Sequence, residues 1–106
     1  MNRIILAMSF LLILTACSRE VINPEVVAYE PQISRLMNNY CITCHGGSAP
    51  SAGLLLNAYE GVKEAGESGK LWDRINDAQN PMPPSGPLSE DKRTQIKNWI
   101  DGGFKR

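Results

Sequence analysis

The segment at residues 41–45, which reads Cys-Ile-Thr-Cys-His, constrains this chain more than any other feature. It contains two of the three cysteines and the only histidine among the 106 residues. Two cysteines separated by two residues occur in zinc sites, in redox-active dithiols and, when a histidine follows at once, at sites of covalent haem attachment. The rest of the sequence has to distinguish these three interpretations.

Zinc and dithiol chemistry both agree poorly with the sequence. A structural zinc site uses four ligands, but here His45 directly follows Cys44 and only carboxylates remain as a fourth ligand. A thioredoxin-like dithiol lies at the N-terminus of a helix within a βαβ pattern. The present pair instead lies near the predicted C-terminus of a helix, in a sequence without recognisable strands. A structural disulfide between Cys41 and Cys44 is similarly disfavoured.

The pattern Cys-x-x-Cys-His is typical of c-type haem attachment. The thiols of Cys41 and Cys44 would form thioethers with the two vinyl groups of the haem, and the imidazole of His45 would bind the iron. An export signal, described below, supports this interpretation because bacterial c-type maturation takes place outside the cytoplasm. We therefore predict one haem c, bound covalently through Cys41 and Cys44.

A sixth iron ligand can be sought by elimination. Because His45 is the only histidine, two histidines of this chain cannot share the iron. Apart from the initiator, Met8 lies in the predicted signal, and Met37 precedes the haem motif by one helical turn, on the same side of the ring. Met82 remains, and the prolines around it restrict its loop, which favours a weak thioether ligand. The alternative is an ordinary core or surface methionine, or a ligand displaced by solvent.

The N-terminus predicts export and a lipid anchor. Arg3 precedes an apolar run at residues 4–13, which is shorter than the roughly 20 residues that span a bilayer and fits a secretory signal. Residues 14–17, Leu-Thr-Ala-Cys, resemble the bacterial lipoprotein box, in which the cysteine is lipidated and becomes the mature first residue. The alternative is an ordinary signal peptide with an incidental Cys17.

The chain is therefore expected to have three segments: a lipoprotein-type signal at 1–16, a lipidated N-terminus and tether at 17–30, and a monohaem domain at 31–106. The alternative for the tether is that part of it, around residues 26–27, packs on the domain. More than one acyl chain anchors a protein stably, so a lipid on Cys17 predicts a place on a membrane of the bacterial envelope, facing the periplasm or the exterior. Ser18, in place of an aspartate, weakly favours the outer membrane.

Hydrophobic periodicity predicts an all-α domain without strand pairs or repeats. Apolar residues recur at steps of three and four from Ile33 onward, so a helix is expected from Pro31 to about Cys44. Further helices are expected near 59–65, at about 69–77, and after Ser89 as far as the glycines at 102–103. Ser89 is the expected N-cap of the last helix. Four prolines exclude regular helix from residues 80–87.

The haem motif, the "NPMPP" segment around Met82 and the closing "LSEDKRTQIKNWIDGG" together resemble a small class I cytochrome c domain. The resemblance covers about residues 32–104. It implies a small cytochrome c fold in which three to five short helices wrap around one covalently bound haem. It also implies that the first and last helices cross, so that these side chains meet: Ile33, Met37, Tyr40, Ile96, Trp99 and Ile100. Many members have a small residue where this chain has Ile33, so a looser or shifted crossing is expected.

The resemblance also suggests which other residues surround the haem. Candidate lining residues are Leu54, Leu56, Leu71 and Ile75, with plain core packing as the alternative. Candidates for hydrogen bonds to the haem propionates are Trp72, Trp99 and Arg74; the alternatives are core positions for the tryptophans and a surface salt bridge for the arginine. His45 is expected to donate its other ring N–H to a backbone carbonyl, that of Ala49 or Pro50.

Histidine and methionine together raise the haem reduction potential relative to two histidines and leave no open iron site. We therefore expect a membrane-tethered electron carrier with redox protein partners in the cell envelope, and no catalytic residues. Balanced charges, 11 basic and 11 acidic, give no indication of nucleic-acid binding. The alternatives are a haem-bearing subunit of a larger redox enzyme complex, or a haem-based gas sensor if Met82 is labile.

Overall fold

The structure is a computed structural model that describes residues 25–106, so the predicted signal and Cys17 lie outside the described residues. It contains five α-helices: α1 (Ser34–Tyr40), α2 (Ile42–His45), α3 (Tyr59–Glu67), α4 (Lys70–Ile75) and α5 (Glu90–Asp101). A π-helical turn, η1 (Tyr29–Ile33), precedes α1, and a 3-10 turn, η2 (Ser51–Gly53), follows α2. Because residues 25–106 include no strand, the predicted all-α class is confirmed.

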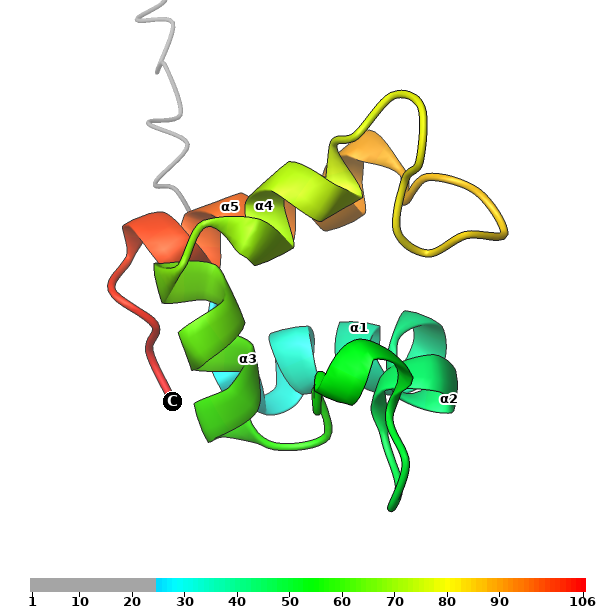
Figure 1. Ribbon diagram of the computed structural model, residues 1–106. Helices are drawn as coiled ribbons and strands as arrows, with labels where there is room; N and C mark the ends of the chain where they lie inside the picture. Colours follow the sequence, from blue (N-terminus) through cyan, green and yellow to red (C-terminus); the bar gives the residue numbers. More distant parts are fainter. Residues whose placement is uncertain (1–24) are drawn as a thin grey trace, which may run out of the picture.

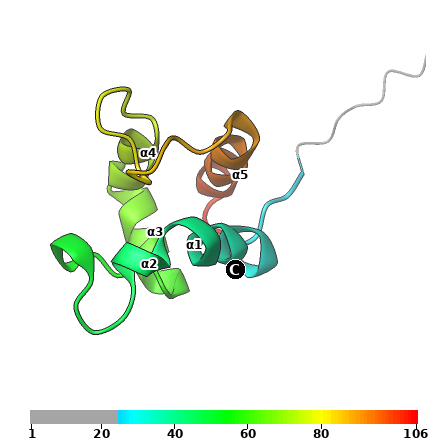
Figure 2. The ribbon, with the colours of Figure 1, turned by 90° about the vertical axis from the view of Figure 1, so that its right-hand side faces the viewer.

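The helices surround a central space, a cavity to which all five α-helices contribute lining residues. Figures 1 and 2 show α1 and α2 on one side of this space and α4 and α5 on the other, with α3 closing one end. The long connection between α4 and α5 lies at the opposite end. Within residues 25–106, no helix is long and apolar enough to cross a membrane.

The three C-terminal helices form where the apolar pattern predicted them. On α3 the buried residues are Val62, Ala65 and Gly66, and on α4 they are Leu71 and Ile75, four positions apart, which places them on one face. Gly69 separates α3 from α4 with a φ of +79°, a left-handed conformation that glycine adopts readily. α5 buries Ile96 and Trp99.

The N-terminal helix is divided, which corrects the single helix expected over residues 31–44. Cys41 has φ −122° and ψ −43°, outside the α-helical region, and so separates α1 from α2. Hydrogen bonding nevertheless continues through the break, from the Cys41 N–H to the Met37 carbonyl at 2.9 Å and from the His45 N–H to the Cys41 carbonyl at 2.9 Å. Hydrophobic periodicity cannot detect such a break because it leaves the spacing of apolar residues unchanged.

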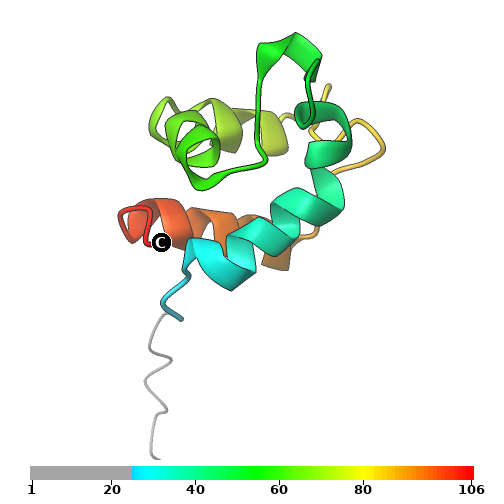
Figure 3. The ribbon, with the colours of Figure 1, turned by 90° about the horizontal axis from the view of Figure 1, so that it is seen from below.

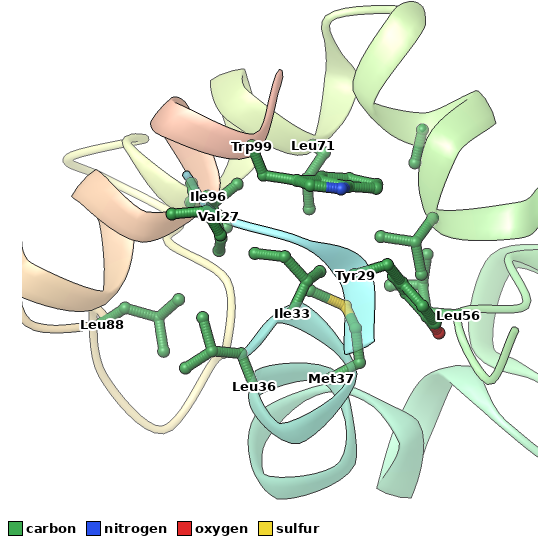
Figure 4. Packing of buried hydrophobic residues seen from close by; sticks show 13 residues of the cluster. Val27, Tyr29, Ile33, Leu36, Met37, Leu56, Leu71, Leu88, Ile96 and Trp99 are labelled. Carbon is green, nitrogen blue, oxygen red and sulfur yellow. The ribbon is translucent and has the colours of Figure 1, made fainter. Parts of the chain in front are cut away.

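The predicted crossing of the first and last helices is present but shifted toward the N-terminus. η1, rather than the whole of α1, contacts α5, and Figure 3 shows α1 diverging from α5 toward α2. Ile33, Met37 and Trp99 are at most 1% exposed, and Figure 4 shows them in one apolar cluster. The shift agrees with the bulky side chain at residue 33, which occupies the crossing.

Tyr40 does not join this core, contrary to the expectation. Its side chain is 39% exposed, and the Lys92 ammonium lies 5.6 Å from the centre of its ring. Tyr40 is the last residue of α1, and its contact with α5 is made to the charged side chain of Lys92 near the start of that helix. The crossing therefore ends before this side chain.

The domain begins earlier than residue 31. Val27 and Tyr29 are buried in the core, and the Tyr29 N–H donates to the Lys105 carbonyl at 2.8 Å. The end of the expected tether therefore packs on the domain, as the alternative interpretation allowed. Val26 points outward and is 65% exposed, so Val27 is the residue of this pair that contributes apolar contacts.

Ser89 occupies the N-cap position of α5, as expected, but its side chain makes no capping hydrogen bond. Its hydroxyl instead accepts a hydrogen bond from the Lys92 ammonium at 3.3 Å. The acidic residues of the first turn, Glu90 and Asp91, interact favourably with the helix dipole at this end.

Candidate cofactor site

A cavity of about 1050 Å³ lies among the helices. This volume is slightly above the range of roughly 300–1,000 Å³ that is usual for small-molecule sites. Cys41, Cys44 and His45 line it from the α1–α2 side, and Met82 lines it from the connection between α4 and α5. The fold therefore brings together the four residues that the sequence singled out, although Met82 is distant from the other three in the chain.

Apolar side chains make up much of the remaining wall. All four predicted lining residues are present: Leu54, Leu56, Leu71 and Ile75. Leu56, Leu71 and Ile75 are between 3% and 7% exposed, whereas Leu54 is 38% exposed and lies toward the rim. Burial of each leucine or isoleucine side chain is worth about 1.5–3 kcal/mol, so an apolar ligand here would extend the small core.

The two cysteines differ in environment. Both are free; Cys41 is half-buried and Cys44 is exposed. Burial raises the pKa of the Cys41 thiol to about 11, so this thiol stays protonated at neutral pH. Redox-active dithiols depend on a lowered cysteine pKa, and the environment of Cys41 has the opposite effect. The described residues also contain no group of three or more His, Cys, Asp or Glu side chains arranged to hold a metal ion.

The imidazole of His45 is oriented by two backbone carbonyls. Its Nδ1 lies 3.1 Å from the carbonyl oxygen of Ser51 and 3.2 Å from that of Leu54. A carbonyl oxygen can only accept a hydrogen bond, so Nδ1 is the donor to the backbone, and in the neutral ring Nε2 keeps a free lone pair. This is the tautomer that a metal ligand requires.

The prediction that the carbonyl of Ala49 or Pro50 accepts the hydrogen bond of His45 was wrong, because the carbonyls of Ser51 and Leu54, slightly later in the chain, take this place. The chain turns back at η2, where the Gly53 N–H donates to the Pro50 carbonyl at 3.0 Å. Ala52 adopts a left-handed φ of +55° within this turn, which a non-glycine residue seldom does. The turn directs the carbonyls of Ser51 and Leu54 at the ring.

Met82 is held in place through its backbone. Its N–H donates to the carbonyl of Arg74 at the end of α4, at 3.0 Å. The connection between α4 and α5 contains no regular helix, as the prolines predicted. Met37 also lines the cavity, but it does so from α1, on the side of the haem motif, as expected.

Of the three residues suggested for propionate contacts, only Arg74 lines the cavity. Trp99 is fully buried, and its indole N–H donates to the Lys105 carbonyl at 2.8 Å, so that suggestion was wrong. The ring of Trp72 does not reach the cavity and lies 5.6 Å from the Lys97 ammonium. Sequence reasoning missed Glu64 and Lys70, two charged residues that line the cavity, because nothing marks them among the other charges of α3 and α4.

Comparison with known proteins agrees with this geometry. Residues 41–86 match the model of a family described as Planctomycete cytochrome C. The matched segment, which is less than half of the chain, begins at the first cysteine of the motif and includes Met82. It supports a cytochrome c-like domain, with haem c as the cofactor and haem-based electron transfer as the role. No curated protein and no solved structure matches the chain.

The residues around the cavity fit a haem of the c type. Two free thiols are available for thioether bonds, and the Nε2 of His45, which is not engaged with the two carbonyls, is available to iron on the same wall. Met82 offers a thioether sulfur from another wall of the same cavity, and leucines and isoleucines supply apolar contacts. A haem bound here would meet two thiols suited to covalent attachment and two side chains suited to binding iron.

Proposed function

We propose that this chain is a membrane-tethered c-type cytochrome that carries electrons in the bacterial envelope, with one haem ligated by His45 and Met82. The observation that supports this most is the convergence of Cys41, Cys44, His45 and Met82 on one cavity. When bound, the haem would supply reversible one-electron redox chemistry. The protein would supply attachment, iron ligands and a water-poor environment.

In this proposal, Cys41 and Cys44 hold the cofactor through thioether bonds. His45 binds the iron through Nε2, and its two carbonyl partners, Ser51 and Leu54, keep the ring from rotating. Such hydrogen bonds also increase the basicity of a histidine ligand. The motif thereby becomes one rigid wall of the site.

Met82 would be the second iron ligand, provided from the connection between α4 and α5. A thioether ligand raises the reduction potential relative to a second histidine and closes the iron to oxygen and peroxide. Buried apolar residues such as Leu56 and Ile75 would keep water away from the haem. Outer-sphere electron transfer, rather than catalysis, is the function that these features favour.

The tether is proposed from the sequence alone, since Cys17 lies outside the described residues. A lipid at Cys17 would keep the domain near redox partners in the envelope and raise their effective concentration, with the outer membrane slightly favoured by Ser18. Redox encounters use small, transient interfaces. The loops at 46–53 and 82–87, which contribute residues to the rim of the cavity, are the proposed contact with a redox protein partner.

Binding of carbon monoxide tests the electron-carrier role against the gas-sensor alternative. The full-length protein is matured in a host that attaches c-type haem, reduced, and mixed with carbon monoxide beside its Met82→Ala variant. We expect rapid binding only in the variant, because Met82 occupies the iron site in the parent protein. Equally rapid binding by the parent would contradict the electron-carrier proposal and favour the gas sensor.

A further inference from the structure

We propose that Asp77 is a positioning residue that holds the loop of Met82 in the shape required for iron ligation. This inference rests on the proposed function, in which Met82 is the sixth ligand. Asp77 lies two residues after α4, and its side chain points into the loop that leads to Met82. One carboxylate oxygen, Oδ1, accepts the backbone N–H groups of Gln79 and Asn80, both at 2.9 Å.

The hydrogen bonds of Asp77 and Arg74 close the loop on itself. The other carboxylate oxygen of Asp77, Oδ2, accepts a hydrogen bond from the Arg74 guanidinium at 3.2 Å. The carbonyl of the same Arg74 accepts the Met82 N–H at 3.0 Å. The chain therefore leaves α4 just after Arg74 and returns to Arg74 at Met82, with the Asp77 carboxylate bound inside the turn.

Asp77 orders the part of the loop that the prolines leave free. Prolines at 81, 83 and 84 restrict the backbone around Met82. Residues 77–80 contain no proline, and their conformational freedom would otherwise have to be lost when Met82 binds. By accepting the N–H groups of Gln79 and Asn80, the carboxylate fixes this segment before Met82 reaches the iron.

The start of the loop is also attached to α5. The guanidinium of Arg93 donates to the Asn76 side-chain oxygen at 2.9 Å, and the Asn76 amide donates to the Trp72 carbonyl at 2.8 Å. The backbone N–H groups of Asn80 and Gln79, followed by the Arg74 guanidinium, hold the pKa of the Asp77 carboxyl below its usual range. The charged form that makes these contacts is therefore the form present at neutral pH.

An ordered loop should make Met82 harder to displace from the iron. An external ligand such as imidazole binds the ferric iron only when Met82 has left, so its apparent affinity reports the fraction of molecules in that open state. Loss of the Asp77 contacts leaves the sulfur chemically unchanged and makes the open state more populated. Asp77 thus acts through Met82 and does not itself line the cavity.

Titration of the full-length, haem-loaded ferric protein with imidazole tests this inference. The far-red absorption band of methionine sulfur on ferric iron is recorded for the same samples. We expect Asp77→Ala to bind imidazole about tenfold more tightly than the parent, which corresponds to about 1.4 kcal/mol. Asp77→Asn keeps an oxygen for the two N–H groups but loses the ion pair with Arg74, so an intermediate affinity is expected. If Asp77→Ala does not load haem, the comparison is made with Asp77→Asn alone.

Asp73→Ala is the matched control, because Asp73 lies one helical turn earlier and makes no hydrogen bond through its side chain among the described residues. It should bind imidazole as the parent does. The inference is overturned if the Asp77 variants match Asp73→Ala while the parent shows the far-red band. A parent that lacks the band and binds imidazole as tightly as Met82→Ala contradicts the proposed function itself, and the inference falls with it.

Discussion

The axial histidine shows how backbone geometry determines the chemistry of one side chain. Two carbonyls, those of Ser51 and Leu54, converge on Nδ1 of His45, so Nδ1 is the donor to the backbone and Nε2 is the nitrogen left for a ligand. The two cysteines beside it are not equivalent, since Cys41 is half-buried and Cys44 is exposed. Burial and hydrogen bonding, more than residue type, therefore decide the reactivity of each group in the motif.

The difference between the cysteines predicts ordered alkylation of the chain when it is produced without haem maturation. Cys44 should react first with iodoacetamide at pH 8, because burial both shields Cys41 and raises the pKa of its thiol to about 11. The Cys41 rate should keep rising with pH toward that value, since only the thiolate is nucleophilic. Peptide mass spectrometry after short exposure measures both rates; faster labelling of Cys41 would show that the assigned environments are wrong.

The C-terminal residues connect several helices. The Tyr59 hydroxyl donates to the Phe104 carbonyl at 2.7 Å, and the Phe104 ring meets the Trp99 ring edge-on, with centres 5.0 Å apart. Arg106 lies over the Tyr59 ring, 4.1 Å from its centre. This segment therefore joins α3 to the end of α5, at the end of the molecule away from the α4–α5 connection (Figure 1).

Close packing of α3 against Phe104 predicts that Gly66→Ala destabilises the fold. A Cβ atom at residue 66 would lie 2.6 Å from Cε1 of the Phe104 ring, and the ring cannot move freely because it also packs on Trp99. Overpacking of this kind costs about 1–3 kcal/mol. Denaturant unfolding of the parent and of Gly66→Ala measures this difference in the free energy of unfolding.

The double variant Gly66→Ala/Phe104→Leu is the control for this prediction. Removal of the ring should relieve the clash, so the alanine should cost less in this background than in the parent. Equal costs in the two backgrounds would mean that the contact does not limit packing.

Sequence reasoning succeeded where repeated patterns carry the information and failed where a single backbone angle does. Apolar spacing located α3, α4 and α5, and elimination selected Met82, which does line the cavity from the connection between α4 and α5. The division of the first helix depends on the dihedral angles of Cys41 alone. The carbonyl partners of His45 depend on the left-handed φ of Ala52, which its residue type does not indicate.

At the scale of the molecule, a small domain is arranged around a cavity that is large for its size. The buried core within residues 25–106 includes side chains from every α-helix except α2, together with Val27, Leu56 and Leu88 from outside the helices. α2 instead carries Cys44 and His45 to the cavity wall. A haem in the cavity would supply the apolar partner that such a small core lacks. The N-terminus is predicted to attach this domain to a membrane.

Lipidation at Cys17 predicts that one substitution releases the protein from the membrane. In a bacterial host, Cys17→Ser should prevent lipid attachment and move the protein from the membrane fraction to the soluble fraction, or leave it as an unprocessed precursor. Incorporation of labelled palmitate and cell fractionation measure both effects. Ser18→Ala is the control and should stay lipidated; labelled Cys17→Ser protein would contradict the anchor.

The most direct test of the account is the absorption spectrum of the ferric full-length protein after maturation in a host that attaches c-type haem. We predict covalently bound haem and the weak far-red band of methionine sulfur on iron, which Met82→Ala should abolish. Met37→Leu, a change of similar volume at the other methionine that lines the cavity, should keep the band. Covalent haem without the band in the parent, or loss of the band in Met37→Leu alone, would contradict ligation by Met82.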